Sequence, residues 1–130
     1  ALVLGEGVWS KRLAPGGWRG LLESAAITQL PIMVFVASSG VIQIHTGSIK
    51  RLGQAGDWFN ILDPRFNLHL LAPSVVETWV VRKPTVDGIV TSIELFDGKG
   101  DVILYLFGKR KPGQEEDPAW RECVESISRT

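Results

Sequence analysis

Helical periodicity is found in two stretches of the chain. The first lies between Trp18 and Ala25, where apolar residues recur every three or four positions. Proline disfavours helical backbone in the residue before it, so this helix is predicted to end before Pro31. Residues 1–16, which are rich in glycine and small side chains, are expected to form an irregular lead-in.

The second helix is predicted over residues 117–128. Asp117 supplies a capping carboxylate, and Pro118 follows at the first helical position, where its missing N–H costs nothing. Apolar residues between Trp120 and Ile127 then form a single stripe. This helix is therefore expected to bury one face against the rest of the domain.

Between the helices the apolar pattern becomes that of strands, either alternating or continuous. Strands are predicted at residues 32–36, 41–49, 66–70, 75–81, 89–96 and 101–107. Residues 53–57 are expected to be a loop, and the sequence from Asp97 to Gly100 is a strong hairpin turn. Hairpins follow one another instead of alternating with helices, which argues against a doubly wound sheet.

The whole pattern predicts an α+β fold, with a multi-stranded antiparallel sheet of about six strands flanked by an N-terminal and a C-terminal helix. The 130 residues fit one domain. Its lead-in and first helix occupy residues 1–30, the sheet residues 31–110 and the C-terminal helix residues 117–128. Both helices are expected on one face of the sheet, which leaves the other face for a ligand or a second subunit.

Charge and composition exclude several functions. The formal net charge is zero, and the basic residues 109–111 are followed closely by Glu115 and Glu116, so nucleic-acid binding is not expected. The single cysteine, Cys123, cannot form an internal disulfide and fits a reducing compartment. The longest strongly apolar stretch, residues 31–36, is far too short to cross a bilayer, so we expect no membrane insertion.

General catalytic and metal motifs give no assignment. The sequence has no Walker loop, no dinucleotide-binding glycine pattern and no nucleophile elbow, and we assign no catalytic residue. One cysteine and two histidines are too few for a closed zinc site. His45 and His69 lie on predicted strands. Each is either a half-buried, hydrogen-bonded side chain or an iron ligand, since neutral imidazole suits iron.

Several dense segments of the chain are similar to one protein family. They are PIMVFVASSGVIQIHTG (31–47), WFNILDPRFNLHL (58–70), ETWVVRKPTVDGIVTSIELF (77–96), LFGKR (106–110) and WR (120–121). Together they resemble the second repeat of HemS/HmuS/ChuX-type haem-utilisation proteins. The resemblance implies a large antiparallel sheet with flanking helices. It also implies that the ligand is haem or a related tetrapyrrole, handled in the bacterial cytoplasm.

The family's haem contacts correspond to four positions of this sequence, and a fifth residue, Tyr105, is a candidate substitute. Phe35 corresponds to a phenylalanine that packs against the porphyrin face, although its wholly apolar strand equally predicts a core side chain. Lys83 and Arg110 correspond to cations that pair with the haem propionates, because carboxylates in a partly dry pocket need cationic partners. From the residues alone, both could equally be solvated charges at the ends of strands. Phe107 stands where relatives carry a tyrosine, which removes a hydroxyl donor from the pocket. Tyr105, predicted on the same face, is expected to take over part of that role.

The axial iron ligand is the main departure from the family pattern. In relatives, the iron-binding histidine lies on a helix upstream of the phenylalanine motif, whereas residues 1–30 contain no histidine. Three alternatives remain at this point. The ligand lies upstream of this sequence, a second subunit supplies one, or His45 or His69 substitutes.

The resemblance implies a haem carrier or buffer in haem and iron utilisation. One alternative is a haem-degrading enzyme, an activity with which several relatives have been credited. Another is an interaction module that kept the fold without haem ligation. Whether the protein is an enzyme is therefore left open. A single repeat exposes a surface that its tandem partner would cover, so we expect a homodimer.

Overall fold

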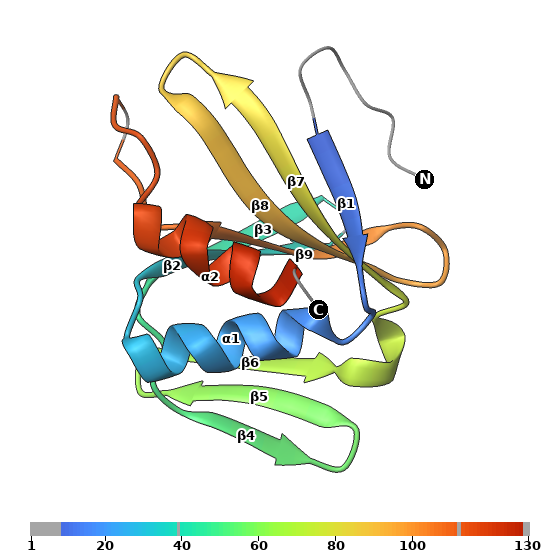
Figure 1. Cartoon of the computed structure of the whole chain (residues 1–130). Helices are drawn as coiled ribbons and strands as arrows, with labels where there is room; N and C mark the ends of the chain where they lie inside the picture. The colour runs from blue at the N-terminus through green and yellow to red at the C-terminus, as the bar shows by residue number, and fades with distance from the viewer. Residues whose placement is uncertain (1–8, 39, 112, 129–130) are drawn as a thin grey trace.

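The computed structural model describes residues 9–38, 40–111 and 113–128. These residues form nine strands, two α-helices and one short 3-10 turn (Figure 1). In chain order the elements are β1 (Trp9–Leu13), α1 (Gly17–Thr28), β2 (Ile32–Ser38), β3 (Val41–Gly47), β4 (Leu52–Ala55), β5 (Trp58–Asp63), β6 (Phe66–Leu71), η1 (Ala72–Ser74), β7 (Glu77–Thr85), β8 (Gly88–Phe96), β9 (Val102–Gly108) and α2 (Pro118–Ser128).

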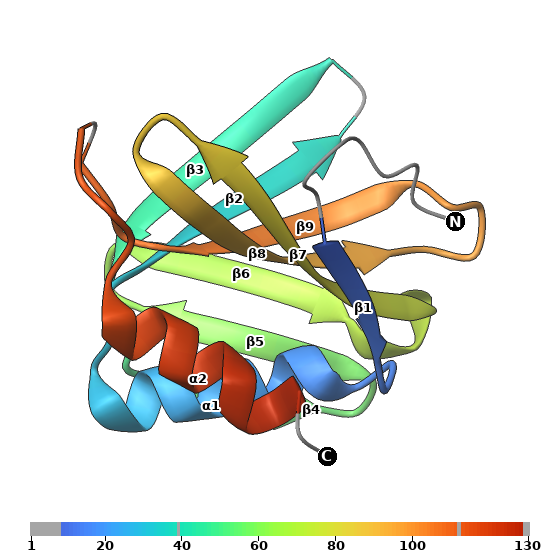
Figure 2. The same cartoon turned by 45° about the horizontal axis from the view of Figure 1, so that its top comes forward.

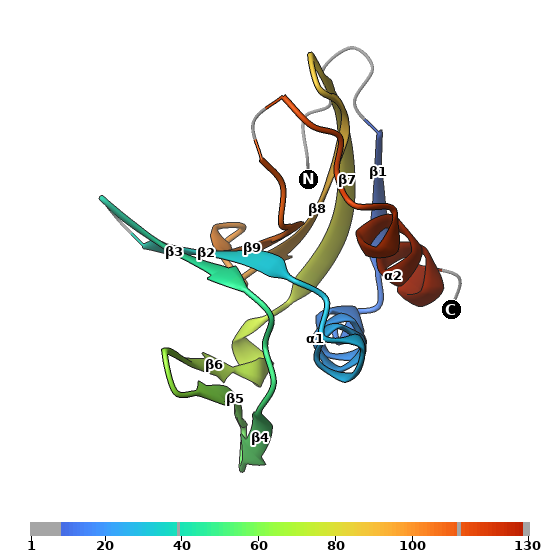
Figure 3. The same ribbon diagram turned by 90° about the vertical axis from the view of Figure 1, so that its left-hand side faces the viewer.

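Six strands form one antiparallel sheet in the order β1-β7-β8-β9-β2-β3. The β2–β3 hairpin joins this sheet beside β9, so an early hairpin and the last strand become neighbours (Figure 2). Both helices lie on one side of the sheet (Figure 3). The prediction of an α+β fold, with an antiparallel sheet and both helices on one face, is confirmed.

The helices and the sheet share one core. α1 and α2 bury the apolar stripes that their spacing predicted. Facing them, alternate residues of the strands are fully buried: Ile32, Val34, Val80, Ile93, Leu104 and Leu106. α1 ends where Gln29 takes the left-handed conformation, with φ at 53°, and the Leu30 N–H then donates to the Ala25 carbonyl. The helix therefore ends before Pro31, as predicted.

A second sheet was not predicted. It consists of β4, β5 and β6, and it packs against the first helix through the rings of Trp18 and Phe59, whose centroids are 5.0 Å apart. The prediction of a loop over residues 53–57 is wrong, because β4 occupies Leu52–Ala55 and a tight turn at Gly56 leads into β5. The sequence did not predict β4, because this short edge strand contains glycine and glutamine and lacks an alternation of apolar and polar residues.

The expected irregular lead-in is also wrong in part. Residues 9–13 form β1, which pairs with β7 from Trp9 opposite Arg82 to Leu13 opposite Thr78. Only Leu13 of this strand is buried, so the sequence of β1 lacks the alternation of apolar and polar residues that would predict a strand. The pairing across the sheet edge, rather than local preference, is what makes this segment a strand. Residues 1–8 of the lead-in lie outside the described residues.

Candidate functional site

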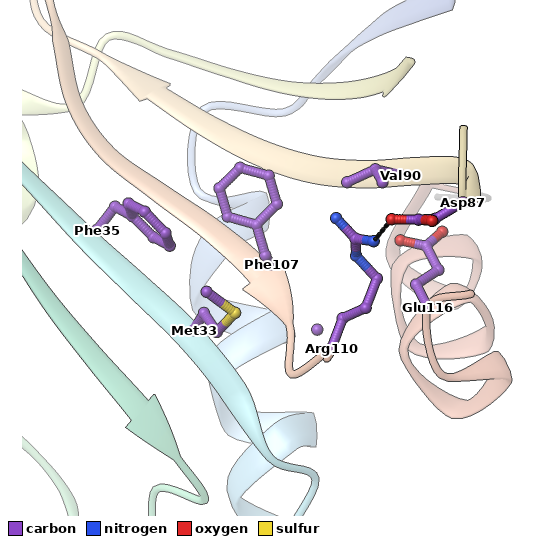
Figure 4. Close-up of a pocket in the computed structure, with 8 residues that line it drawn as sticks. Met33, Phe35, Asp87, Val90, Phe107, Arg110 and Glu116 are labelled. Atoms are coloured by element: carbon purple, nitrogen blue, oxygen red, sulfur yellow. Dashed lines mark hydrogen bonds and ion pairs between the residues drawn. The ribbon is translucent and has the colours of Figure 1, made fainter. Parts of the chain in front are cut away.

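A cavity of about 350 Å³ opens on the face of the six-stranded sheet that the helices leave uncovered. We call this side the open face. Figure 4 shows the residues that surround the cavity. They come from β2, β8, β9 and the segments that follow β7 and β9, and they are Met33, Phe35, Asp87, Val90, Phe107, Gly108, Arg110 and Glu116.

Aromatic side chains form one wall of the cavity. In antiparallel pairs, residues opposite each other project to the same face, and Met33 pairs with Phe107 while Phe35 pairs with Tyr105. The Phe35 and Phe107 rings meet edge to face with centroids 5.2 Å apart, and Tyr105 lies 6.4 Å from Phe107. Three half-buried rings therefore stand together on the open face, as the alternation along β2 and β9 requires.

Arg110 brings a positive charge to the other side of the cavity. Its Nη1 donates to Asp87 Oδ2 at 3.0 Å and to the carbonyl oxygen of Gln114 at 3.2 Å. The second terminal nitrogen points toward the space between Phe107 and Val90 (Figure 4). One side of the guanidinium is thus held by the protein, and the other side faces the cavity.

Lys83 stands next to the cavity without lining it. It is exposed on β7 directly opposite Val90 on β8, so both side chains project to the open face. Val90 itself lines the cavity. The structure therefore brings Phe35, Phe107 and Arg110 together around the cavity, and it places Lys83 and Tyr105 beside them on the same face.

Glu116 supplies a negative charge that the protein already satisfies. This carboxylate is only 4% exposed and accepts hydrogen bonds from the backbone N–H and the hydroxyl of Thr91, both at 2.7 Å. Arg121 donates to it at 2.8 Å. Because these donors saturate and neutralise the carboxylate, its role is to fix the segment after β9 against β8.

Tyr105 remains a neutral hydroxyl at physiological pH. Burial raises the pKa of this phenol above its ordinary value, and the nearby Glu94 carboxylate raises that pKa further. Glu94 is itself buried and accepts a hydrogen bond from the Ser92 hydroxyl at 3.0 Å. Tyr105 can therefore donate a proton in a hydrogen bond on the open face, where Phe107 cannot.

The structure places both histidines away from the cavity. His45 lies opposite Val34 on the helix side of β3, and its ring stacks on Phe66 with centroids 4.0 Å apart. Its Nε2 is buried without a hydrogen-bond partner among the described residues, and burial lowers its pKa, an effect that Asp63 partly opposes. His69 is exposed on β6, where its Nδ1 lies 2.8 Å from Asn60 Oδ1.

Sequence reasoning missed Met33 and Asp87. Met33 carried a usable signal, because it precedes Phe35 by two positions on the same strand and so shares its face. Asp87 carried none, since it lies between the two strands predicted at residues 75–81 and 89–96 and meets Arg110 only through the fold. Met33 is also the one cavity-lining residue among those described whose side chain, a thioether, is of a kind that ligates haem iron.

Within the described part of the chain, no helix is both long and apolar enough to span a bilayer. Among the same residues, no cluster of three or more histidine, cysteine, aspartate or glutamate side chains is arranged to hold a metal ion.

Known proteins with similar sequences cover most of this chain. The haemin transport protein HemS of Yersinia enterocolitica is 45% identical over 108 residues, which are 83% of this chain and 31% of that protein. HmuS, a haemin transport protein of Yersinia pestis, is 44% identical over 80% of this chain and 30% of its own length. The chain therefore spans about a third of the length of these relatives.

A solved structure with the same fold is holo-PhuS, a haem-binding protein of Pseudomonas aeruginosa. It is 54% identical and has a TM-score of 0.90, with 95% of this chain and 35% of that chain covered. The sequence model of the haemin-degrading HemS/ChuX domain matches residues 1–127. The chain belongs to the HemS/ChuX domain family.

Proposed function

We propose that this domain binds haem in the cavity of the open face. Phe35 and Phe107 would pack against the macrocycle, and Arg110 and Lys83 would pair with the propionates. One observation carries the proposal: the aromatic wall and the Arg110 guanidinium line the same cavity. A planar apolar ligand with carboxylates at one edge matches that arrangement.

The charges near the cavity support a carboxylate-bearing ligand. Glu116 is neutralised within the protein, and Arg110 retains donors toward the cavity. Guanidinium groups offer five N–H donors in a plane, so Arg110 can hold Asp87 and a ligand carboxylate at once. Lys83 adds an exposed ammonium beside Val90, suited to a second carboxylate at the cavity mouth.

Iron ligation is a separate question from porphyrin binding. His45 and His69, proposed as iron ligands on sequence grounds, would have to act away from this cavity, because neither lines it. Met33 offers a thioether within the cavity. The residues present thus fit the macrocycle and its carboxylates, and binding of an iron-free porphyrin tests this fit without any axial ligand.

Carriage or buffering of haem in haem and iron utilisation is the role that we propose for this binding. We also propose a cytoplasmic homodimer. The single cysteine suits a reducing compartment. At the end of the sheet, β3 presents Ile42 and Ile44 at 65% and 58% exposure, an apolar strip suited to a second copy. Light scattering that reports a monomer at micromolar concentration would contradict the dimer.

The test of haem binding is a titration with hemin and with iron-free protoporphyrin IX, followed by Soret absorption and tryptophan fluorescence. Saturable one-to-one binding of both is expected. Arg110→Ala should weaken protoporphyrin binding about fivefold, and Lys83→Ala about two- to threefold, because rim ion pairs are worth up to about 1 kcal/mol.

Two exposed residues that do not line the cavity serve as controls. Arg65 lies at the turn between β5 and β6, and Lys99 at the turn between β8 and β9. Their alanine variants should bind like the unaltered protein. If neither Arg110→Ala nor Lys83→Ala differs from its control, the propionate assignment is wrong. Adding a reductant to the hemin complex then separates carriage from degradation, since a carrier should yield no defined product.

A further inference from the structure

Asp87 lies at the tip of the hairpin between β7 and β8 and lines the cavity beside Arg110. The turn holds its backbone, because its N–H donates to the Thr85 hydroxyl oxygen at 3.2 Å. That hydroxyl in turn donates to the Gly88 carbonyl oxygen at 2.7 Å. The hairpin tip is therefore shaped by its own hydrogen bonds and does not need the Asp87 side chain.

The Asp87 side chain is used instead on the segment that follows β9. Its Oδ2 accepts from Arg110 Nη1 at 3.0 Å and from the Gly113 N–H at 3.3 Å. Arg110 Nη1 also donates to the Gln114 carbonyl oxygen. The Asp87 carboxylate thus ties Arg110 and the Gly113 backbone directly to the hairpin, 23 and 26 residues away in the sequence, and Arg110 in turn holds the Gln114 carbonyl.

We propose that Asp87 is a positioning residue that selects ligands with a free carboxylate. It holds Nη1 of Arg110 and leaves the second terminal nitrogen directed into the cavity (Figure 4). This inference rests on the proposed function, because it assigns to Asp87 the orientation of the cation that meets the ligand. It identifies the ligand by its carboxylates and requires no particular metal.

Fixing Arg110 in advance strengthens ligand binding because it lowers the conformational entropy that is lost when the ligand binds. An arginine side chain that is free in solution loses rotamer freedom when a ligand immobilises it. The Asp87 and Arg110 side chains are only 25% and 26% exposed, so their ion pair fixes the guanidinium before the ligand arrives. The ligand then meets an ordered donor and does not have to order it.

A carboxylate beside a ligand carboxylate could instead act by repulsion, and the two roles have opposite signs. If Asp87 mainly repelled the ligand or occupied Arg110, its removal would tighten binding. If it positions Arg110, its removal weakens binding, and only of ligands that Arg110 contacts. Among the described residues Arg110 donates through Nη1 only, and its other terminal nitrogen faces the cavity, so the geometry favours positioning.

The experiment compares protoporphyrin IX with its dimethyl ester, both iron-free and in the same low fraction of organic co-solvent. The variants are Asp87→Ala, Asp87→Asn, Arg110→Ala and the double variant Asp87→Ala/Arg110→Ala. Asp87→Ala should weaken diacid binding about two- to fivefold, in the range of partly exposed ion pairs. The ester affinity should not change. Asp87→Asn, which keeps an acceptor oxygen, should lose less than Asp87→Ala.

The double variant tests whether Asp87 acts through Arg110. In the Arg110→Ala background, Asp87→Ala should have no further effect on diacid binding. Asp97→Ala is the matched control, because the Asp97 carboxylate accepts from the Lys99 and Asp101 N–H groups and so holds the turn between β8 and β9. It should leave the ratio of diacid to ester affinity unchanged.

Several outcomes overturn the inference. If Asp87→Ala binds the diacid more tightly, Asp87 acts by repelling the ligand. If Asp87→Ala loses equal affinity for the diacid and the ester, Asp87 has only a structural role. If the losses of the two single variants add up in the double variant, Asp87 does not act through Arg110. If the unaltered protein binds neither porphyrin, the proposed function fails and the inference fails with it. If the unaltered protein binds the diacid and Arg110→Ala weakens it while Asp87→Ala does not, only the inference about Asp87 fails.

Discussion

The two faces of the six-stranded sheet are built from the same strands, yet they have different tasks. Along β9, Leu104 and Leu106 are fully buried against the helices, whereas Tyr105 and Phe107 stand half-buried on the open face. The covered face is closed by side chains of α1 and α2, while the open face holds a cavity. Period-two alternation thus lets one strand stabilise the fold and build a ligand site with adjacent residues.

This division predicts that substitutions on the covered face change folding stability, and that substitutions on the open face change ligand binding. Stability here means the free energy of unfolding in urea, and binding means the affinity for protoporphyrin IX. The following experiments test the division, from the largest expected effect to the smallest.

Trp120 is the strongest test of the covered face. Its side chain is fully buried, and its Nε1–H donates to the Thr91 carbonyl oxygen at 2.9 Å. Trp120→Ala should lower the free energy of unfolding by about 3–5 kcal/mol, because it opens a large cavity and leaves that carbonyl unpaired. Trp58, which is 47% exposed, gives the matched variant Trp58→Ala, and an equal loss there would contradict the prediction.

Leu106 and Phe107 are neighbours on β9, and their substitution is expected to change different properties, stability for Leu106 and mainly porphyrin affinity for Phe107. Leu106→Ala removes a fully buried side chain and should cost about 2–4 kcal/mol of stability. Phe107→Ala should cost less stability, because its ring is only half-buried, and it should lower porphyrin affinity by removing part of the aromatic wall. Urea unfolding and Soret titration of both variants measure the two effects. Equal stability losses with unchanged porphyrin binding would mean that the two faces are not divided in this way.

Gly108 tests how closely the sheet and α2 approach each other. A Cβ atom added at this position would lie 2.6 Å from Trp120 Cγ, closer than atoms can pack. Gly108→Ala should therefore destabilise the fold by about 1–3 kcal/mol, since either β9 or the indole has to shift. Gly16→Ala is the control, because a Cβ there meets nothing within 4 Å. A Gly108 variant as stable as the Gly16 variant would show that the contact relaxes freely.

His45 gives the smallest effect, and the effect depends on pH. Burial lowers its pKa in the folded protein below the ordinary value of 6.5. The unfolded chain therefore binds this proton more readily, so stability is complete above about pH 6.5 and decreases as the pH falls toward the lowered pKa. His45→Gln should reduce the loss of stability between pH 7.5 and 5.5 in urea unfolding. If the variant loses as much as the unaltered protein, other groups cause the dependence, and His69→Gln is the matched comparison on the exposed side of β6.

The sequence predicted those elements whose apolar spacing along the chain matches the face that they bury in the fold. Trp18 to Ala25 and Trp120 to Ile127 showed helical spacing because each helix buries one stripe. β1, β4 and β5 were not predicted. β1 and β4 are edge strands, which bury little of their surface and need no apolar alternation, whereas β5 is the central strand of the second sheet. They exist through pairing with distant or neighbouring strands, a relation that a local window does not contain.

The candidate site was predictable to the same extent. Phe35, Phe107 and Arg110 followed from the family resemblance, and the register between β2 and β9 explains why the two rings meet. Asp87 could not be predicted, because its role depends on a contact with Arg110 between two segments that no motif links. The histidines were proposed by residue type alone, and residue type does not say on which face of a strand a side chain lies.

β1 also has a practical consequence for how this domain is trimmed for expression. A chain cut back to start at the first helix would keep both helices and the whole cavity lining, and so would look complete by sequence. It would nevertheless leave β7 as an uncovered edge with the buried Val80 beside it, in place of the charged strand that carries Lys11 and Arg12. Bare edges of this kind recruit other chains, so such a preparation should precipitate although every ligand-binding residue is present.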